Sequence, residues 1–530
     1  VYGPQADNEK SNFLLEMRHL KTVCSLEWLI LGDFNLISKA DEKSNQNINL
    51  RLLRSFRAAI DDLNLKELPL TGRRFTWSNE RLNCTMTKID KALFTEEWEA
   101  KFPDFQMLAG STKISDHCPL ILKKLNNKRF PGFRFEAWWA TQSGFRETVE
   151  HFWKKPFSCS DHIRRLHIKL TRTAKGLRKW SKQILKERKV AADIASEVIF
   201  QLDVAQESRP LSVEELKLRV FLKSRLLALA AIDKIKWRQR SRLIWIKAGD
   251  ANTRLFHLRA NGRRRKNHIP FLHVDSRVVT EHNDKAGVLF DHFNTLMGQR
   301  QATEKCLNWD YINMPTADLS HLDQPFTLEE LQTAIFDIAA EKAPGPDGFI
   351  GTFFKKCWHT VKIDLLNAVN QMSALDGKQW NLLNTAYIVL IPKKENALRP
   401  HDYRPISLTH SVAKILGKLL ANRVGPELQH IISVSQSAFL RGRSIQENFL
   451  YVQNLIQSLH RAKQPSLFVK LDIAKAFDSV KWDYLLDVLK QVGFSQRCRD
   501  LIAISLASTS SRIILNGVPG APFLHRQGLR

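Results

Sequence analysis

Carboxylate, amide and imidazole side chains recur in three short segments near the start of the sequence. Asp33 and Asn35 are two residues apart, so both point to the same side if the chain is extended there. Asp90 lies in an apolar run, and Asp116 directly precedes His117. Such groups could bind a metal ion, contact a phosphate oxygen and transfer a proton near neutral pH. Each segment alone has a plainer interpretation: a turn, a solvated strand face and a surface pair.

A further candidate carboxylate, Asp472, follows the strand-like run 466–471 and precedes Phe477 by five residues. A charge at the end of a buried strand is unfavourable unless it is paired, so either a metal site or a helix N-cap is expected.

A basic stretch separates these two groups. Residues 234–266 hold 12 Lys and Arg against one acid, Asp250, with Trp237, Trp245 and Phe256 between them. We interpret the charges as a nucleic-acid contact, because so many uncompensated cations would repel one another. The Trp residues are expected to face the core rather than to stack on bases. The candidate contacts are Lys234, Lys236, Arg238, Arg240, Arg242, Arg263, Arg264, Arg265 and Lys266.

Composition limits the class of protein. The 530 residues carry 81 Lys and Arg against 54 Asp and Glu, a net charge of +27, which favours a polyanionic partner. The hydrophobic share of 43% is enough for real cores. Seven scattered Cys without a CxxC pair disfavour a disulfide scaffold and a zinc ribbon. No run approaches the ~20 apolar residues of a membrane span, and no secretory signal pattern is present.

The elements that must position these residues fall into three regions. Residues 1–125 alternate apolar runs with loops, residues 126–320 are helical and basic, and residues 321–530 return to α/β texture. Apolar residues spaced by three or four predict a long amphipathic helix from about Ile163 to Ile184. A second helix should begin after Ser212 with a capping box. Strands are expected at Leu26–Leu31, Phe75–Trp77, Ile89–Phe94, Pro119–Leu122 and Ser466–Leu471, and a helix face from Trp482.

In their order and spacing, the early motifs resemble the endonuclease/exonuclease/phosphatase superfamily, in particular its apurinic-endonuclease-like nucleases. Tyr2-Gly3-Pro4 is similar to that family's tyrosine loop. The resemblance implies an α/β sandwich in which His117 pairs with Asp90 at the scissile phosphate and Asp33 acts on the attacking water. Asn35 and Tyr2 would contact the phosphate, and Asp116 would assist the metal ion. The family's metal-binding Glu and first Asn lie upstream of the tyrosine loop, so we expect this chain to nick DNA weakly or not at all.

The later motifs resemble the reverse transcriptases of LINE-type non-LTR retrotransposons, in a plant-like form. They are Ala343–Gly348, Leu390–Lys394, Tyr403–Leu408, Gln436–Ile445 and Asp472–Asp478. The resemblance implies the fingers and part of the palm of a right-hand polymerase. Asp472 and the carbonyl of Ile473 would bind metal, Phe477 would be the steric gate, and Arg404 with Lys393 would hold the incoming triphosphate. The family's aromatic-x-Asp-Asp motif does not occur before Arg530, so we expect no DNA synthesis from this chain.

Together these resemblances imply a multidomain chain: a truncated α/β sandwich in 1–125, a basic α-helical linker in 126–320, and truncated polymerase fingers and palm in 321–530. It would be part of a retrotransposon polyprotein that nicks target DNA and reverse transcribes element RNA from the nick. Mg²⁺ or Mn²⁺ would be the cofactor; target DNA, template RNA and deoxynucleoside triphosphates would be the partners; nucleus and cytoplasm would be the location. Two alternatives stay open: a decayed or repurposed copy that only binds nucleic acid, and a non-enzymatic scaffold.

Overall fold

The computed structural model describes residues 1–24, 27–79, 84–110, 115–125, 132–241, 253–275, 277–299, 307–312, 314–376, 379–473 and 475–529. Its α-helices are α1 (Lys10–Val23), α2 (Leu50–Asp62), α3 (Glu96–Lys101), α4 (Phe145–Lys154), α5 (His162–Ser208), α6 (Val213–Ser241), α7 (Thr253–Lys266), α8 (His282–Phe293), α9 (Trp309–Ile312), α10 (Leu328–Asp337), α11 (Gly351–Lys356), α12 (Trp358–Ser373), α13 (Ser411–Ile431), α14 (Ile445–Arg461), α15 (Trp482–Val492) and α16 (Gln496–Ala507).

Its strands are β1 (Leu29–Asp33), β2 (Lys66–Glu67), β3 (Leu70–Thr71), β4 (Trp77–Ser78), β5 (Met86–Thr87), β6 (Asp90–Phe94), β7 (Phe105–Ala109), β8 (Leu120–Lys124), β9 (Leu272–Val274), β10 (Arg277–Val279), β11 (Thr385–Pro392), β12 (Tyr403–Thr409), β13 (Ser510–Leu515) and β14 (Val518–Leu524). Among the described helices, none is long and apolar enough to cross a bilayer.

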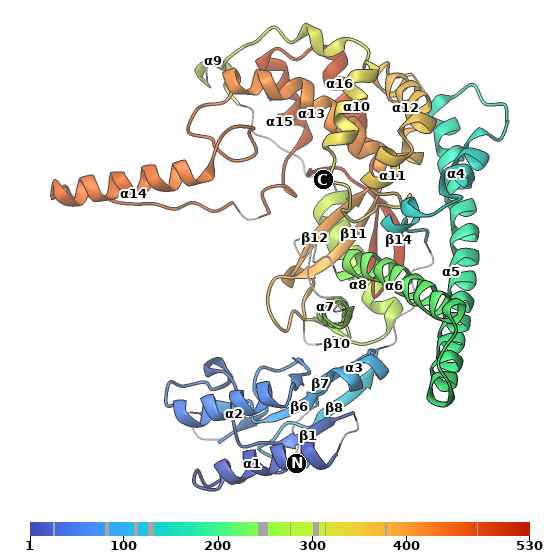
Figure 1. Cartoon of the computed structure of the whole chain (residues 1–530). Helices are drawn as coiled ribbons and strands as arrows, with labels where there is room; N and C mark the ends of the chain where they lie inside the picture. Colours follow the sequence, from blue (N-terminus) through green and yellow to red (C-terminus); the bar gives the residue numbers. More distant parts are fainter. Residues whose placement is uncertain are drawn as a thin grey trace.

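The first 125 residues form a layered α/β unit at one end of the molecule (Figure 1). One sheet has the strand order β1-β6-β2 and the other β3-β7-β8. Alternation along β6 explains the layers: Ala92 and Phe94 join Met107 in a core between the sheets, whereas Leu93 joins Phe56 of α2 in a core on the other side. The strands expected at Leu26–Leu31, Ile89–Phe94 and Pro119–Leu122 correspond to β1, β6 and β8. The strand expected at Phe75–Trp77 overlaps the two-residue strand β4 only at Trp77.

The helical middle region follows the sequence pattern closely. The predicted apolar stripe is buried along the first half of α5, at Ile163, Leu166, Leu170 and Leu177. The capping box predicted before α6 is present, since the backbone of Glu215 donates to Ser212 Oγ and the backbone of Ser212 donates to the Glu215 carboxylate. The two helices form a hairpin along one side of the molecule (Figure 1).

The predicted boundary at residue 320 does not coincide with a break in packing. The buried face of α5 shares one apolar core with α10 to α13, including Phe353 of α11 and Leu365 of α12. Likewise, Leu289 and Phe293 of α8 pack on the sheet of order β12-β11-β13-β14, against Ile388 and Ile513. Helices α5 and α8, from the region expected to be a linker, therefore pack in the same apolar cores as the C-terminal elements.

Two glycines allow the Ala343–Gly348 turn to lie against its neighbours. A Cβ on Gly345 would stand 2.2 Å from the carbonyl oxygen of Thr409, at the end of β12. Gly348 has a φ of +76°, and its Cβ would stand 2.1 Å from the carbonyl oxygen of Phe133. Larger residues at either position would force the turn away from β12 and from the segment before α4.

One predicted element is wrong. The described residues of 466–473 form no strand, and their apolar side chains are exposed, for example Leu467 at 88%. The preceding helix, α14, extends away from the rest of the molecule and has no buried residue (Figure 1). An apolar run becomes a buried strand only when neighbouring strands and a covering layer are available, and neither is adjacent to this segment.

Candidate functional site

Three predicted residues from distant parts of the first region meet at one sheet edge. Strands β1 and β6 are antiparallel with Asp33 opposite Asp90, so both carboxylates lie at the same end of the sheet. A bridge between Trp77 and His117 brings the imidazole to them. Nδ1 of His117 is 3.1 Å from Oδ2 and 3.2 Å from Oδ1 of Asp90. One ligand atom from each of Asp33, Asp90 and His117 lies within 4.8 Å of the others.

Asp33 has an unusual electrostatic environment. Burial raises the pKa of its carboxyl group, and the charges of Asp90 and Asp116 raise it further, while the backbone amide of Asn35 and the His117 side chain act in the opposite direction. A bound cation would relieve the repulsion between these carboxylates. Carboxylate oxygens suit both Mg²⁺ and Mn²⁺, so the two aspartates fit either expected ion.

Asn35 and Tyr2 are placed next to the cluster but not as expected. The Asn35 side chain donates to the carbonyl of Gly3 at 2.8 Å, which commits its amide to the backbone. The amide of Gly3 in turn donates to the Asp33 carbonyl at 2.7 Å. Tyr2 is 71% exposed, and its hydroxyl accepts from Gln5. Asn35 therefore ties the first loop to the end of β1 through its side-chain amide.

Asp116 lies outside the group of three ligand atoms. Its Oδ2 accepts a hydrogen bond from Nε1 of Trp77 at 2.8 Å, and this bond holds the pKa of the carboxyl below its usual range. The direct metal-assisting role predicted for Asp116 does not match this position. Trp77, which sequence reasoning treated only as part of a strand, instead fixes Asp116 and, through its backbone, His117.

A buried ion pair supports the strand that carries Asp90. Lys91 is fully buried, and its Nζ lies 2.8 Å from Oε1 of Glu42. Burial opposes the charge on Glu42, but Lys91 holds the pKa of this carboxyl below its usual range. Sequence reasoning assigned the lysines beside Asp90 to a solvated face. The partner that makes Lys91 a buried residue is remote in sequence, so no local pattern signals it.

Asp472 is not at the end of a buried strand. Asp472 and Ile473 lie in the exposed segment that follows α14, so the predicted metal site is not assembled around them. Phe477 is 58% exposed, and its ring meets the edge of Phe439 with centroids 5.9 Å apart. Lys393 and Arg404 are exposed at the same end of the β11–β12 ladder, as a pair of phosphate ligands requires.

The turn after Phe477 is joined to the final residues of the chain. The amide of Leu529 donates to the Phe477 carbonyl at 2.7 Å, and Nε1 of Trp482 donates to the Gly528 carbonyl at 2.8 Å. Burial raises the pKa of Asp478, whereas the charges of Lys475 and Lys393 lower it. Asp478 is thus a half-buried carboxylate that sequence reasoning did not single out. Its position seven residues after the strand-like run was the available signal.

The basic stretch is compensated by acids from elsewhere in the chain. Arg238 lies 3.6 Å from Glu341, and Arg240 lies 2.7 Å from Glu136. Arg264 lies 2.7 Å from Asp104, and Arg265 is buried at 2.6 Å from Glu99. Each of these four arginines therefore forms an ion pair within the chain, and their role as nucleic-acid contacts stays a prediction.

The other candidates in this stretch differ in their exposure and in their partners. Lys236 lies 4.0 Å from Asp233, Arg263 donates to the Ser241 carbonyl, Lys234 is half-buried and Lys266 is exposed. Arg242, Trp245 and Asp250 lie outside the described residues. Trp237 is half-buried against His257, and Phe256 is buried, so neither ring is an open stacking platform.

Comparison with known proteins supports the resemblance of the C-terminal region to reverse transcriptases. Residues 391–524 match the family described as "Reverse transcriptase (RNA-dependent DNA polymerase)". The whole chain is 22% identical to 42% of the "Transposon TX1 uncharacterized 149 kDa protein" of Xenopus laevis. About half of it, 51%, is 25% identical to 24% of the "Putative 115 kDa protein in type-1 retrotransposable element R1DM" of Drosophila melanogaster.

A third relative is the "Retrovirus-related Pol polyprotein from type-1 retrotransposable element R2" of Nasonia vitripennis, 25% identical over 40% of the chain and 20% of its own length. The chain thus spans less than half of each of these relatives. The matches show that it contains a reverse transcriptase domain and place it among the relatives of non-LTR retrotransposon polyproteins.

Proposed function

We propose that this chain is part of a LINE-type retrotransposon polyprotein that nicks target DNA and copies its RNA from the nick. The nuclease activity is assigned to the α/β unit of residues 1–125. The observation that carries this assignment is the convergence of Asp33, Asp90 and His117, whose ligand atoms lie within 4.8 Å of one another. The resemblance of these motifs to the endonuclease/exonuclease/phosphatase superfamily supports it.

Each member of the cluster has a role that follows from its position. Asp90 accepts from Nδ1 of His117, which fixes the imidazole tautomer and leaves Nε2 to exchange a proton with the phosphate or its leaving group. Asp33, whose raised pKa makes it a better proton acceptor than an ordinary aspartate, orients the attacking water. Mg²⁺ or Mn²⁺ held by these carboxylates would neutralise charge on the phosphoryl oxygens.

The polymerase activity is assigned to the reverse transcriptase domain. Lys393 and Arg404 would contact the triphosphate of the incoming nucleotide from one end of the β11–β12 ladder. Phe477 would lie against its sugar, and Asp472 would bind metal once the 466–473 segment is paired as a strand. Both activities would be useful on one chain, because the 3′-hydroxyl freed by the nick is the primer for reverse transcription.

A nicking assay with matched histidine variants tests the nuclease assignment. Supercoiled plasmid in Mg²⁺ or Mn²⁺ should be nicked slowly, and His117→Ala should reduce the rate by on the order of 10²-fold, the usual contribution of a positioned acid or base. His19→Ala, an exposed change on α1 of the same unit, should leave the rate unchanged. Nicking that persists in His117→Ala would contradict the assignment.

Metal binding provides a second measurement that does not depend on turnover. Free Mn²⁺ measured by electron paramagnetic resonance should show a site that weakens in Asp33→Asn and in Asp90→Asn. Because the pKa of Asp33 is raised, its protonation should weaken Mn²⁺ binding at a higher pH than for an ordinary aspartate. Equal Mn²⁺ affinity in both variants and in the parent chain would show that the cluster is not the metal site.

A further inference from the structure

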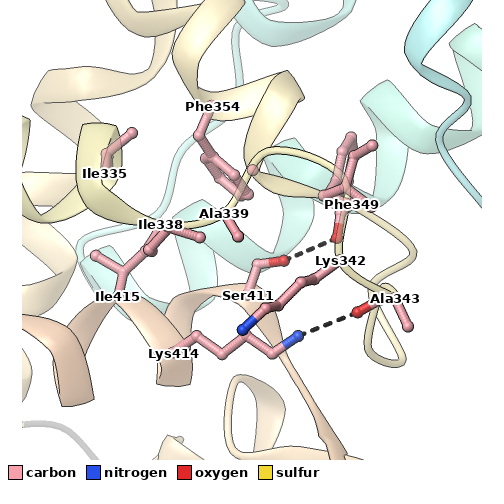
Figure 2. A pocket seen from close by; sticks show the side chains of 12 residues that line it. Ile335, Ile338, Ala339, Lys342, Ala343, Phe349, Phe354, Ser411, Lys414 and Ile415 are labelled. Atoms are coloured by element: carbon pink, nitrogen blue, oxygen red, sulfur yellow. Dashed lines mark hydrogen bonds between the residues drawn. The ribbon is translucent and has the colours of Figure 1, made fainter. Parts of the chain in front are cut away.

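A pocket far in sequence from both candidate sites opens among α10, α11 and α13 (Figure 2). Its volume is about 80 Å³. Lys342 and Ala343, from the loop between α10 and α11, form one side. An engineered apolar cavity of about 150 Å³ holds benzene, so this smaller hollow has room for a short alkyl chain.

The walls of the pocket are apolar and rigid. They are formed by side chains that belong to the main helical core, namely Ile335, Ile338, Phe349, Phe354 and Ile415. Phe349 packs on Phe353 with ring centroids 4.3 Å apart, so the aromatic wall is held from behind. A preformed apolar pocket of this type favours an apolar group that displaces poorly bound water.

The mouth of the pocket is cationic. Lys342 and Lys414 both reach it, and Nζ of Lys414 donates to the carbonyl of Ala343 at 3.3 Å (Figure 2). Burial lowers the pKa of Lys414, and the charge of Lys342 lowers it further, while Asp347 acts in the opposite direction. Among the described residues, neither ammonium group forms an ion pair with a carboxylate. The two ammonium groups therefore lie beside an apolar hollow without a direct carboxylate partner, although Asp347 partly compensates the charge of Lys414.

We propose that this pocket binds a small aliphatic carboxylate, with its short alkyl chain against the apolar walls and its carboxylate between Lys342 and Lys414. An anion there would offset the repulsion between the two ammonium groups, and the chain would fill the hollow. A neutral apolar molecule would contact the apolar walls but would not pair with the two ammonium groups. This site is independent of the nuclease and polymerase assignments.

Occupation of the pocket would reinforce a turn that borders the polymerase sheet. Oγ of Ser411 donates to the Phe349 carbonyl at 3.1 Å, and the Ser411 amide donates to Oδ1 of Asp347 at 3.3 Å. Gly345 of the same turn lies against Thr409, the last residue of β12. A ligand bridging Lys342 and Lys414 would join this turn to α13 by one more contact.

Titration calorimetry with a matched pair of probes tests the proposal. The probes are butyrate and its neutral alcohol analogue, 1-butanol. The acid should bind with saturation and one site, and the alcohol should bind roughly tenfold or more weakly, as expected for loss of one charge-assisted contact. Lys342→Met and Lys414→Met should each weaken binding of the acid by roughly the same factor. Lys362→Met, on α12 and away from the pocket, should leave it unchanged.

Because Lys342 is exposed, its replacement should not impair folding, and circular dichroism melting would verify this for each variant. A third variant, Ala339→Phe, places a ring in the pocket and should abolish binding of both probes. Absence of saturable binding of the acid, equal affinity for acid and alcohol, or unchanged affinity in both lysine variants would each overturn the proposal.

Discussion

Replacing Arg265 should destabilise the contact between the first region and the rest of the chain. Arg265 is on α7, and its partner Glu99 on α3 is 2% exposed. Methionine would keep much of the side-chain volume but leave Glu99 as a buried charge without its partner. Removing one member of a buried pair typically costs about 3–5 kcal/mol, which is a large part of the ~5–15 kcal/mol that stabilises a domain.

The pH dependence of this loss follows from Glu99. Burial already raises the pKa of its carboxyl group above the ordinary 4.5, even with Arg265 present. A carboxyl group with a raised pKa in the folded chain is unfavourable to folding once it ionises, and this cost disappears when both states are protonated. Arg265→Met should raise that pKa further, so the added loss should be largest at neutral pH and should shrink as the pH falls towards 4.5.

The assay is urea unfolding monitored by hydrogen exchange of α3 and β6, because a chain with several packed units need not unfold in one step. The matched control is Arg264→Met, whose pair with Asp104 is 42% and 33% exposed and should contribute less than about 1 kcal/mol. The double change Arg265→Met with Glu99→Leu should recover most of the loss. Equal losses for Arg264→Met and Arg265→Met, or no recovery in the double variant, would refute the reasoning.

Three other changes separate local strain, local propensity and buried charge, each measured by the midpoint of the first thermal transition. Gly348→Ala should destabilise by about 1–3 kcal/mol, because φ is +76° and the new Cβ would stand 2.1 Å from the Phe133 carbonyl oxygen; an unchanged midpoint would contradict the strain. Gly287→Ala lies in α8, where no atom is within 4 Å of the new Cβ, and should stabilise the fold by about 0.5–1 kcal/mol. A lower midpoint would contradict the open space around this position. Lys91→Met should cost about 3–5 kcal/mol because it leaves Glu42 buried and unpaired, and a loss below 1 kcal/mol would indicate that Glu42 reaches water.

Local patterns in the sequence were enough to predict helices α5, α6 and α15 and part of the candidate site. The stripe on α5, the Ser212 cap of α6 and the start of α15 at Trp482 depend on residues within a few turns of one another. The meeting of Asp90 with His117 was predicted from motif order, and the structure places their side chains in contact. Short-range spacing therefore predicted these helices, and motif order predicted the contact between Asp90 and His117.

Properties that depend on distant partners were not predictable in this way. The basic stretch looked uncompensated because its acids, such as Glu341 and Asp104, are about a hundred or more residues away in sequence. The apolar run 466–471 looked like a strand, but a strand needs neighbouring strands to pair with its backbone. The hydrogen bond from Trp77 to Asp116 was likewise not predictable, because it joins residues 39 positions apart in sequence.

Helix α7 makes the orientation of the two regions depend on helical phase. One part of it holds His257 against Trp237 of α6, and its last turn presents Arg264 and Arg265 to Asp104 and Glu99. A helix turns by about 100° per residue, so one residue inserted between these two contacts would point the arginines away from their partners. Four inserted residues would return them to within about 40° of the original direction, one turn further along the axis. The number of residues between these two contacts on α7 therefore fixes how the first region is oriented relative to α6.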